Sequence, residues 1–151
     1  MGNARTPATS TAFVSTSALE ARFGLDRGFD MYEQSFLDEP GALYPPYFAE
    51  RRADRTLDAV EKWLATAPRE KPRFLWIEFS DTLLPYASPQ PFAARYSAST
   101  YDGEVAFVDS QIGRLTQIMR DAGLDDALLV VTSEHGEGLT ENYEQGHGLF
   151  A

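Results

Sequence analysis

The chain has 151 residues and a formal net charge of −10, with 23 acidic residues against 13 lysines and arginines. Hydrophobic residues make up 43% of it, which is ordinary for one globular domain and argues against disorder. The excess of acidic residues argues against nucleic acid or a membrane as a partner. No apolar run is long enough to span a membrane. The chain has no cysteine, which excludes disulfides and thiolate metal sites.

Short apolar runs alternate with helical periodicity along the first half of the chain. A short strand is predicted at residues 11–15, followed by an irregular, aromatic-rich stretch at residues 18–50. Apolar residues recur at helical spacing over residues 50–66, opposite a charged face, and this pattern predicts a helix. The run at residues 74–79 is typical of a buried strand and predicts that Trp76 lies in the core.

The second half continues the same alternation. Residues 83–91 contain three prolines and are predicted to form a loop. A second helix is expected at residues 100–122, with Ser99 as its N-cap and Gly123 just past its end. The aliphatic run at residues 128–132 is the clearest strand prediction. Together these elements predict an α/β fold with at least three mostly parallel strands flanked by helices.

Four blocks of sequence follow one another in an order that is specific when they are taken together. They contain the strings TAFVS and RFGLDRGFD, FLWIEF through PY, YDGEVAFVD, and VTSEHGE followed by GHG. The blocks occupy residues 11–15 with 22–30, residues 74–86, residues 101–109, and residues 131–137 with 146–148. With them the chain resembles the sulfatase family of the alkaline-phosphatase superfamily. The resemblance implies an alkaline-phosphatase-like core, of which residues 1–151 are a single partial domain.

The resemblance also implies a reaction, the metal-dependent hydrolysis of sulfate esters or of related phosphate esters. In the family a formylglycine, made from Cys or Ser within a Cys/Ser-x-Pro-x-Arg motif, is the nucleophile. No such motif, and so no formylglycine site, occurs in this chain. In the family the motif lies upstream of the block at residues 22–30. We therefore expect a sulfatase-like hydrolase segment that is inactive alone, because the nucleophile region is absent.

Three residues near the end of the chain occupy positions that the family uses for its site. The resemblance implies Glu134 and His135 as metal ligands, and His135 and His147 as catalytic residues. It implies a divalent metal, Ca²⁺ or Mg²⁺ in preference to Mn²⁺ or Zn²⁺. The ligand that it implies is an anionic ester. Glu134 replaces the family's Asp, and Leu83 and Glu78 stand where the family often has histidines. The alternative interpretation is that Glu134 and His135 are solvated loop residues and that His147 is a flexible histidine near the C-terminus.

Three functions are compatible with these features. The first is the sulfatase-like hydrolase, present as a segment that needs a missing complementary part. The second is a non-catalytic binding or interaction module descended from a sulfatase, which forms a homo-oligomer through an exposed sheet edge. The third is a phosphodiesterase-like activity of a metal-bound hydroxide at Glu134 and His135. Asp102 and Glu104, at the start of the second predicted helix, are assigned to helix stabilisation and not to catalysis.

Overall fold

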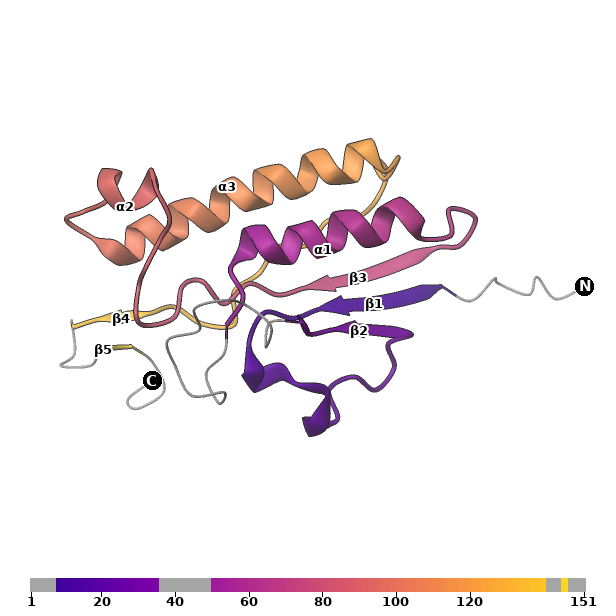
Figure 1. Ribbon diagram of the computed structural model, residues 1–151, viewed down its shortest axis with the longest axis horizontal. Helices are drawn as coiled ribbons and strands as arrows, with labels where there is room; N and C mark the ends of the chain where they lie inside the picture. Colours follow the sequence, from indigo (N-terminus) through magenta and orange to yellow (C-terminus); the bar gives the residue numbers. More distant parts are fainter. Residues whose placement is uncertain (1–7, 36–49, 141–144, 147–151) are drawn as a thin grey trace, which may run out of the picture.

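A computed structural model of the chain describes residues 8–35, 50–140 and 145–146, and its centre is a small parallel sheet (Figure 1). The central strand β1 (Thr9–Phe13) pairs in parallel with β2 (Met31–Glu33) on one side and with β3 (Arg73–Ile77) on the other. The strand order is β2-β1-β3. The prediction of at least three parallel strands flanked by helices is therefore confirmed.

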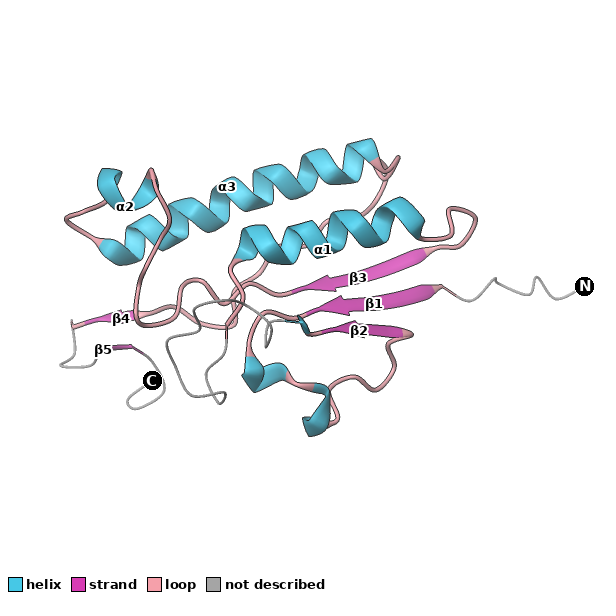
Figure 2. Ribbon diagram, viewed as in Figure 1, coloured by secondary structure: helices cyan, strands magenta, loops and turns pink. Residues whose placement is uncertain are grey.

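Two long helices cover one face of this sheet (Figure 2). They are α1 (Ala53–Thr66) and α3 (Thr100–Asp121), and both were expected from their apolar periodicity. Their inner side chains and those of the sheet form the main core. Its fully or nearly buried members are Phe13, Leu57, Val60, Leu64, Leu115 and Ile118. Burial of these side chains away from water is the main source of stability of the two-layer unit.

The ends of α3 follow the expected local chemistry. The Ser99 side chain accepts a hydrogen bond from the Asp102 amide, as an N-cap does. Gly123 has φ of 69°, a left-handed conformation that glycine adopts without the steric cost that a side chain would add. Both predictions about this helix are confirmed. A single turn of helix, α2 (Phe92–Arg95), precedes α3 and packs against it.

The second face of the sheet carries large apolar side chains that remain accessible. Along β3 the side chains alternate, so Leu75 and Ile77 pack on the core while Phe74 and Trp76 are each 52% exposed. Phe74 stacks on Phe29, with the ring centroids 6.2 Å apart. The prediction that Trp76 lies in the core is wrong, because its position on the strand directs it away from the helices.

The predicted strand at residues 128–132 is not formed in the structure. These residues pair with no strand in the described part of the chain, and the Val130 side chain is 72% exposed. An aliphatic run becomes a strand only when a neighbouring strand accepts its backbone hydrogen bonds. In its place the structure has β2, within the stretch expected to be irregular, and a short antiparallel pair, β4 (Gly138–Leu139) with β5 (Gln145–Gly146).

The remaining irregular segments include two short 3₁₀ turns after β1, η1 (Ser17–Leu19) and η2 (Ala21–Phe23).

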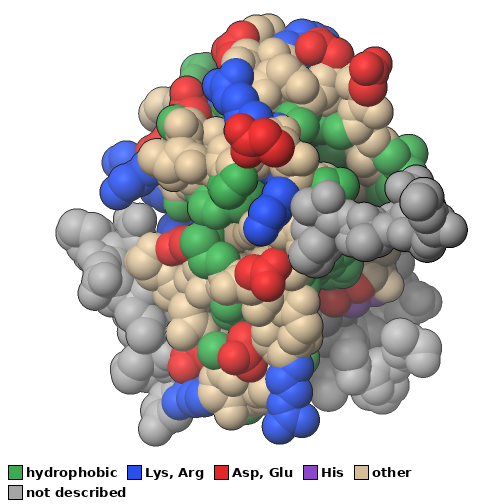
Figure 3. Space-filling view, turned by 90° about the vertical axis from the view of Figure 1, so that its right-hand side faces the viewer, with side chains coloured by type: hydrophobic (Ala, Val, Ile, Leu, Met, Phe, Trp, Pro, Cys, Tyr) green, Lys and Arg blue, Asp and Glu red, His purple; other side chains and the backbone are tan. Residues whose placement is uncertain are grey.

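Seen from the amino ends of the strands, the surface carries interspersed acidic and basic side chains with apolar groups between them (Figure 3). Within the described residues, none of the helices combines the length and the apolar character that crossing a membrane requires.

Candidate functional site

The carboxyl ends of the three parallel strands meet at one edge of the sheet, which is where open α/β folds place their sites. Ser15 lies just after β1, Glu33 ends β2, and Glu78, Ser80 and Asp81 follow β3. In contrast to the mixed charge of the opposite end, this edge gathers carboxylates, hydroxyl groups and one buried arginine. We call this group of side chains, together with Arg51 and Glu104 described below, the carboxyl-edge site.

A serine–glutamate network joins the ends of β1 and β3. The Ser15 backbone N–H and its hydroxyl both donate to Glu78 Oε2, at 2.7 and 2.9 Å, and the Ser15 and Ser80 hydroxyl oxygens lie 2.9 Å apart. Ser15 is fully buried and Ser80 nearly so. Burial raises the pKa of Glu78, the nearby Glu134 carboxylate adds to the rise, and the bonds from Ser15 oppose it. The network holds two strands together and leaves Ser15 inaccessible to a substrate.

Arg51 supplies the positive charge at this edge, and its side chain is only 3% exposed. Its guanidinium donates to the Val14 carbonyl at 2.9 Å and to the Thr56 hydroxyl at 3.1 Å, and it forms an ion pair with Glu33 at 2.6 Å. Burial opposes ionisation of Glu33, but the hydrogen bonds from Arg51 and Ser35 dominate together and lower its pKa. Arg51 therefore joins β1, β2 and the start of α1.

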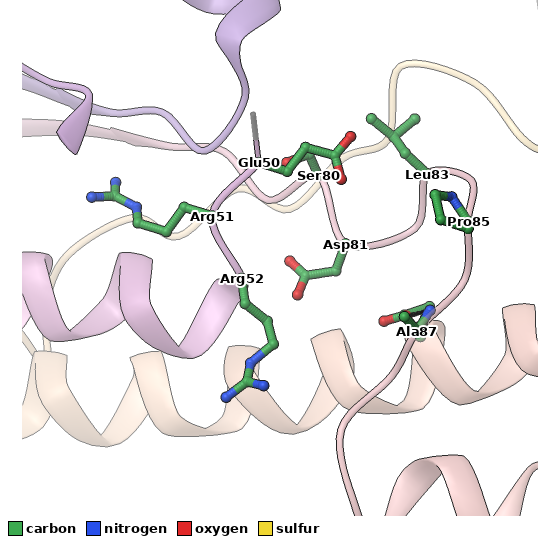
Figure 4. A pocket seen from close by; sticks show the side chains of 9 residues that line it. Glu50, Arg51, Arg52, Ser80, Asp81, Leu83, Pro85 and Ala87 are labelled. Carbon is green, nitrogen blue, oxygen red and sulfur yellow. Dashed lines mark hydrogen bonds between the residues drawn. The ribbon is translucent and has the colours of Figure 1, made fainter. Parts of the chain in front are cut away.

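A cavity of about 170 Å³ opens beside these groups, between the start of α1, the loop after β3 and the first turn of α3 (Figure 4). Glu50, Asp81 and Glu104 line it together with Arg51 and Arg52. Its remaining lining residues are Ser80, Leu83, Pro85 and Ala87. Leu83 thus places an apolar side chain on the wall where the family pattern often has a histidine.

The carboxylates of this cavity accept hydrogen bonds from backbone amides of other elements. Both Asp81 carboxylate oxygens lie 3.0 Å from the Ala53 N, so Asp81 caps α1 from across the cavity, where the N-cap residue Arg52 makes no side-chain cap. Glu104 Oε1 accepts from the Ala87 N at 2.5 Å. Glu104, predicted from the sequence to stabilise its own helix, is instead buried and holds the loop.

Burial makes the ionised forms of these groups unfavourable. It is the largest cause that raises the pKa of Asp81 to about 6 and that of Glu104 to about 7. The same cause, followed by the charges of Asp81, Glu78 and Glu104, raises the pKa of Glu50 to about 7. These carboxyl groups therefore keep their protons to a higher pH than carboxyl groups in water do.

The two predicted metal ligands lie outside this cavity. Glu134 and His135 are adjacent in the chain, and His135 Nε2 lies 3.5 Å from Glu134 Oε1. The Glu134 side chain is 86% exposed and the His135 side chain 41% exposed. The other ring nitrogen, His135 Nδ1, is 2.6 Å from the Gly136 carbonyl oxygen. Glu134 is near enough to Glu78 to affect its pKa.

The donors around Glu134 and His135 do not fit a divalent metal without additional ligands. Ca²⁺ takes six to eight oxygen ligands and Mg²⁺ six, several of which can be waters or substrate oxygens, and a Zn²⁺ site requires at least three protein ligands. Across residues 8–35, 50–140 and 145–146, no three His, Asp or Glu side chains are arranged to hold a metal ion. His147, the other predicted catalytic residue, lies outside the described residues.

Sequence reasoning missed most of the carboxyl-edge site. Ser15, Arg51 and Glu104 belong to ordinary strand and helix patterns and were not candidates. The available signal was the position of Ser15 at the end of one predicted strand and of Asp81 two residues after the next, which places both at the site edge of a parallel sheet. The partners that bury Arg51 and Glu104 come from distant segments, so no local pattern indicates them.

Comparison with known proteins gives a consistent match. The sequence model of the family described as Sulfatase matches residues 8–150. Among curated proteins, "Inner membrane protein YejM" of Salmonella typhi is 29% identical over 153 aligned residues, and the protein of that name from Salmonella typhimurium strain LT2 is 28% identical. Each alignment covers 95% of this chain and 25% of the relative. The chain thus spans about a quarter of the length of these relatives.

Proposed function

This chain belongs to the sulfatase family, and on that premise we propose that its 151 residues form a structural unit of a sulfatase-type protein that does not by itself hydrolyse sulfate or phosphate esters. The observation that carries the proposal is the use of the carboxylates at the carboxyl-edge site. Asp81, Glu104 and Glu78 each accept a hydrogen bond from a backbone amide of another segment. These carboxylates serve as structural acceptors.

The pair Glu134 and His135 is consistent with the same proposal. Both side chains are partly or largely exposed on a segment outside any helix or strand, whereas a catalytic metal site needs its ligands placed to within about 0.5 Å. If a divalent cation is bound in the complete site, the pair would supply one carboxylate and one imidazole, and the cation would supply charge stabilisation for an ester. Other ligands and the nucleophile would have to come from elsewhere.

The test is an ester hydrolysis assay on the purified chain. Aryl sulfate and aryl phosphate esters would be incubated with the chain in the presence of Ca²⁺, Mg²⁺, Mn²⁺ or Zn²⁺, beside a His135→Ala variant. We expect no turnover above the variant with any metal. Metal-dependent turnover that disappears in His135→Ala would contradict the proposal and would support the metal-hydroxide activity of Glu134 and His135.

A second candidate function, a non-catalytic interaction module, is favoured by one specific observation. β3 is an edge strand of the three-stranded sheet, and its outward side chains Phe74 and Trp76 are half exposed on the face opposite the helices. Apolar groups on an open edge promote pairing with another chain. Light scattering coupled to gel filtration tests this candidate, because a concentration-dependent dimer that is lost in Trp76→Ser supports it and a monomer at all concentrations contradicts it.

A further inference from the structure

The loop after β3 is joined to both long helices through one carboxylate at each end. At its beginning, Asp81 accepts from the Ala53 amide of α1 through both oxygens. Near its end, the Ala87 amide donates to Glu104 of α3 at 2.5 Å. We refer to residues 80–87 as the latch loop. Both carboxylates line the same cavity, so the two attachments enclose one shared space.

Charges from several elements face this space. Asp81 faces Asp54 and Arg52 of the α1 start, and Glu104 faces Asp81 and Arg52. Glu50, just before α1, faces Asp81, Glu104 and Glu78. Arg52 offsets part of the negative charge while it pairs with Asp54 at 2.6 Å, and the other arginine on the cavity wall, Arg51, pairs with Glu33. Negative groups therefore outnumber positive ones around the buried carboxyls.

We propose that Asp81 and Glu104 form a proton-controlled latch that holds the latch loop against α1 and α3. When the carboxyl groups are protonated, their carbonyl oxygens still accept the Ala53 and Ala87 amide hydrogens without placing charge in the partly buried cavity. When they ionise, water solvates them better than the cavity does, so conformations in which the loop has moved away gain population. The latch is distinct from any hydrolytic role and does not depend on the inactivity proposed above.

The sign follows from the direction of the pKa shifts. A carboxyl whose pKa is higher in the closed form binds more protons there than in an open, hydrated form. The closed form is therefore most favoured at low pH, and its advantage declines between the ordinary carboxyl pKa, about 4, and the raised values of about 6 and about 7. Each group changes the closed-to-open ratio by at most about tenfold per pH unit within its window.

The experiment is a pH titration of the 151-residue chain followed by the amide NMR signals of Ala53 and Ala87. These amides contact one carboxylate each, so they report the two groups separately. We expect the Ala53 signal to titrate with a midpoint of about 6 and the Ala87 signal with a midpoint of about 7. Hydrogen-exchange protection of Ala87, corrected for the intrinsic exchange rate, should fall as the pH rises from 5 to 8, by roughly tenfold or more.

Matched variants assign the effect. Glu104→Gln and Asp81→Asn keep an acceptor oxygen in nearly the same place, so the fold should persist, and the methyl signals of the core confirm this. We expect Glu104→Gln to abolish the Ala87 titration and flatten its protection profile, and Asp81→Asn to do the same for Ala53. Asp58→Asn, on the exposed side of α1, should change neither profile.

Two results would overturn the latch. In the first, both amides titrate with midpoints near 4, as expected for carboxyl groups in water. In the second, the amides titrate as expected but Ala87 protection in the unmodified chain stays constant or rises with pH, which would mean that ionisation does not release the loop. If Glu104→Gln leaves the Ala87 titration unchanged, another group is responsible and the assignment to Glu104 is wrong.

Discussion

The two faces of strand β3 differ sharply although they belong to one five-residue segment. On one face, Leu75 and Ile77 of β3 pack with the apolar sides of α1 and α3. On the other face, Phe74 and Trp76, their immediate neighbours in the chain, are each half exposed. Because strand side chains alternate with a period of two, one residue of sequence decides whether an apolar group adds to the core or to the surface.

The difference separates two contributions of apolar residues. The covered face, in which Phe13, Leu57 and Val60 are fully buried, determines the stability of the chain. On the other face Ala12 of β1 is also fully buried, but Phe74 and Trp76 of β3 are half exposed, so these two side chains contribute less to stability and present an accessible apolar surface. The substitutions below test this separation, from the largest expected effect to the smallest.

The strongest test of the covered face is Leu57→Ala. Leu57 lies on α1, is fully buried and belongs to the main core. Removing its side chain loses buried apolar area and leaves a cavity, so the free energy of unfolding should fall by about 3 kcal/mol. Chemical denaturation measures the change. Leu128→Ala removes the same group from an 89% exposed position and should leave stability nearly unchanged. Equal effects of the two would contradict the account.

Leu75→Ala applies the same test within β3. Leu75 is partly buried against the core, so its truncation should lower the free energy of unfolding by about 2 kcal/mol, less than Leu57→Ala. The neighbouring Phe74→Ala is the control from the opposite face. If Phe74→Ala destabilises the chain more than Leu75→Ala in the same denaturation experiment, the outer face is covered in solution.

Ser99→Ala tests whether the helix layer depends on its local cap. The Ser99 side chain satisfies the Asp102 amide at the start of α3, and its loss should lower the free energy of unfolding by about 1 kcal/mol. Ser99→Asp supplies another good N-cap acceptor and should restore most of the stability. An unchanged denaturation midpoint in Ser99→Ala would show that the first turn of α3 is held by tertiary contacts alone.

Trp76→Ser should have the smallest effect on stability, below about 1 kcal/mol, because half of the side chain is already in water. Its main effect should be on self-association, if the outer face is used for contact. Sedimentation velocity of the variant and the unmodified chain at several concentrations measures this. A large loss of stability without any change in association would place Trp76 in a buried environment.

The sequence predicted the elements whose signals are local. The periodicities of α1 and α3, the Ser99 cap and the glycine after α3 all depend on residues close together in the chain, and the structure agrees with them. The alternation of predicted strands and helices indicated the α/β class, and the family match over residues 8–150 supports it.

The features that sequence reasoning missed depend on partners that are distant in the chain. The three-residue strand β2 is too short to show alternation, and it forms because β1 supplies its hydrogen bonds. The aliphatic run at residues 128–132 resembles a strand whether or not a partner is present. Trp76 was assigned to the core because an apolar run does not reveal which face is covered. Glu104 accepts its hydrogen bond from Ala87, a loop residue 17 positions earlier in the chain.

We propose that the acidic side chains of the carboxyl-edge site are structural acceptors and that residues 8–35, 50–140 and 145–146 hold no firm metal site on their own. Titration of the chain with Mn²⁺ tests it directly, because the ion broadens the NMR signals of amides close to where it binds. The account predicts only weak, non-saturating broadening at the Mn²⁺ concentrations used in the assay, with Glu134→Gln and His135→Ala behaving like the unmodified chain. Saturable broadening at residues 133–136 that is lost in His135→Ala would contradict it.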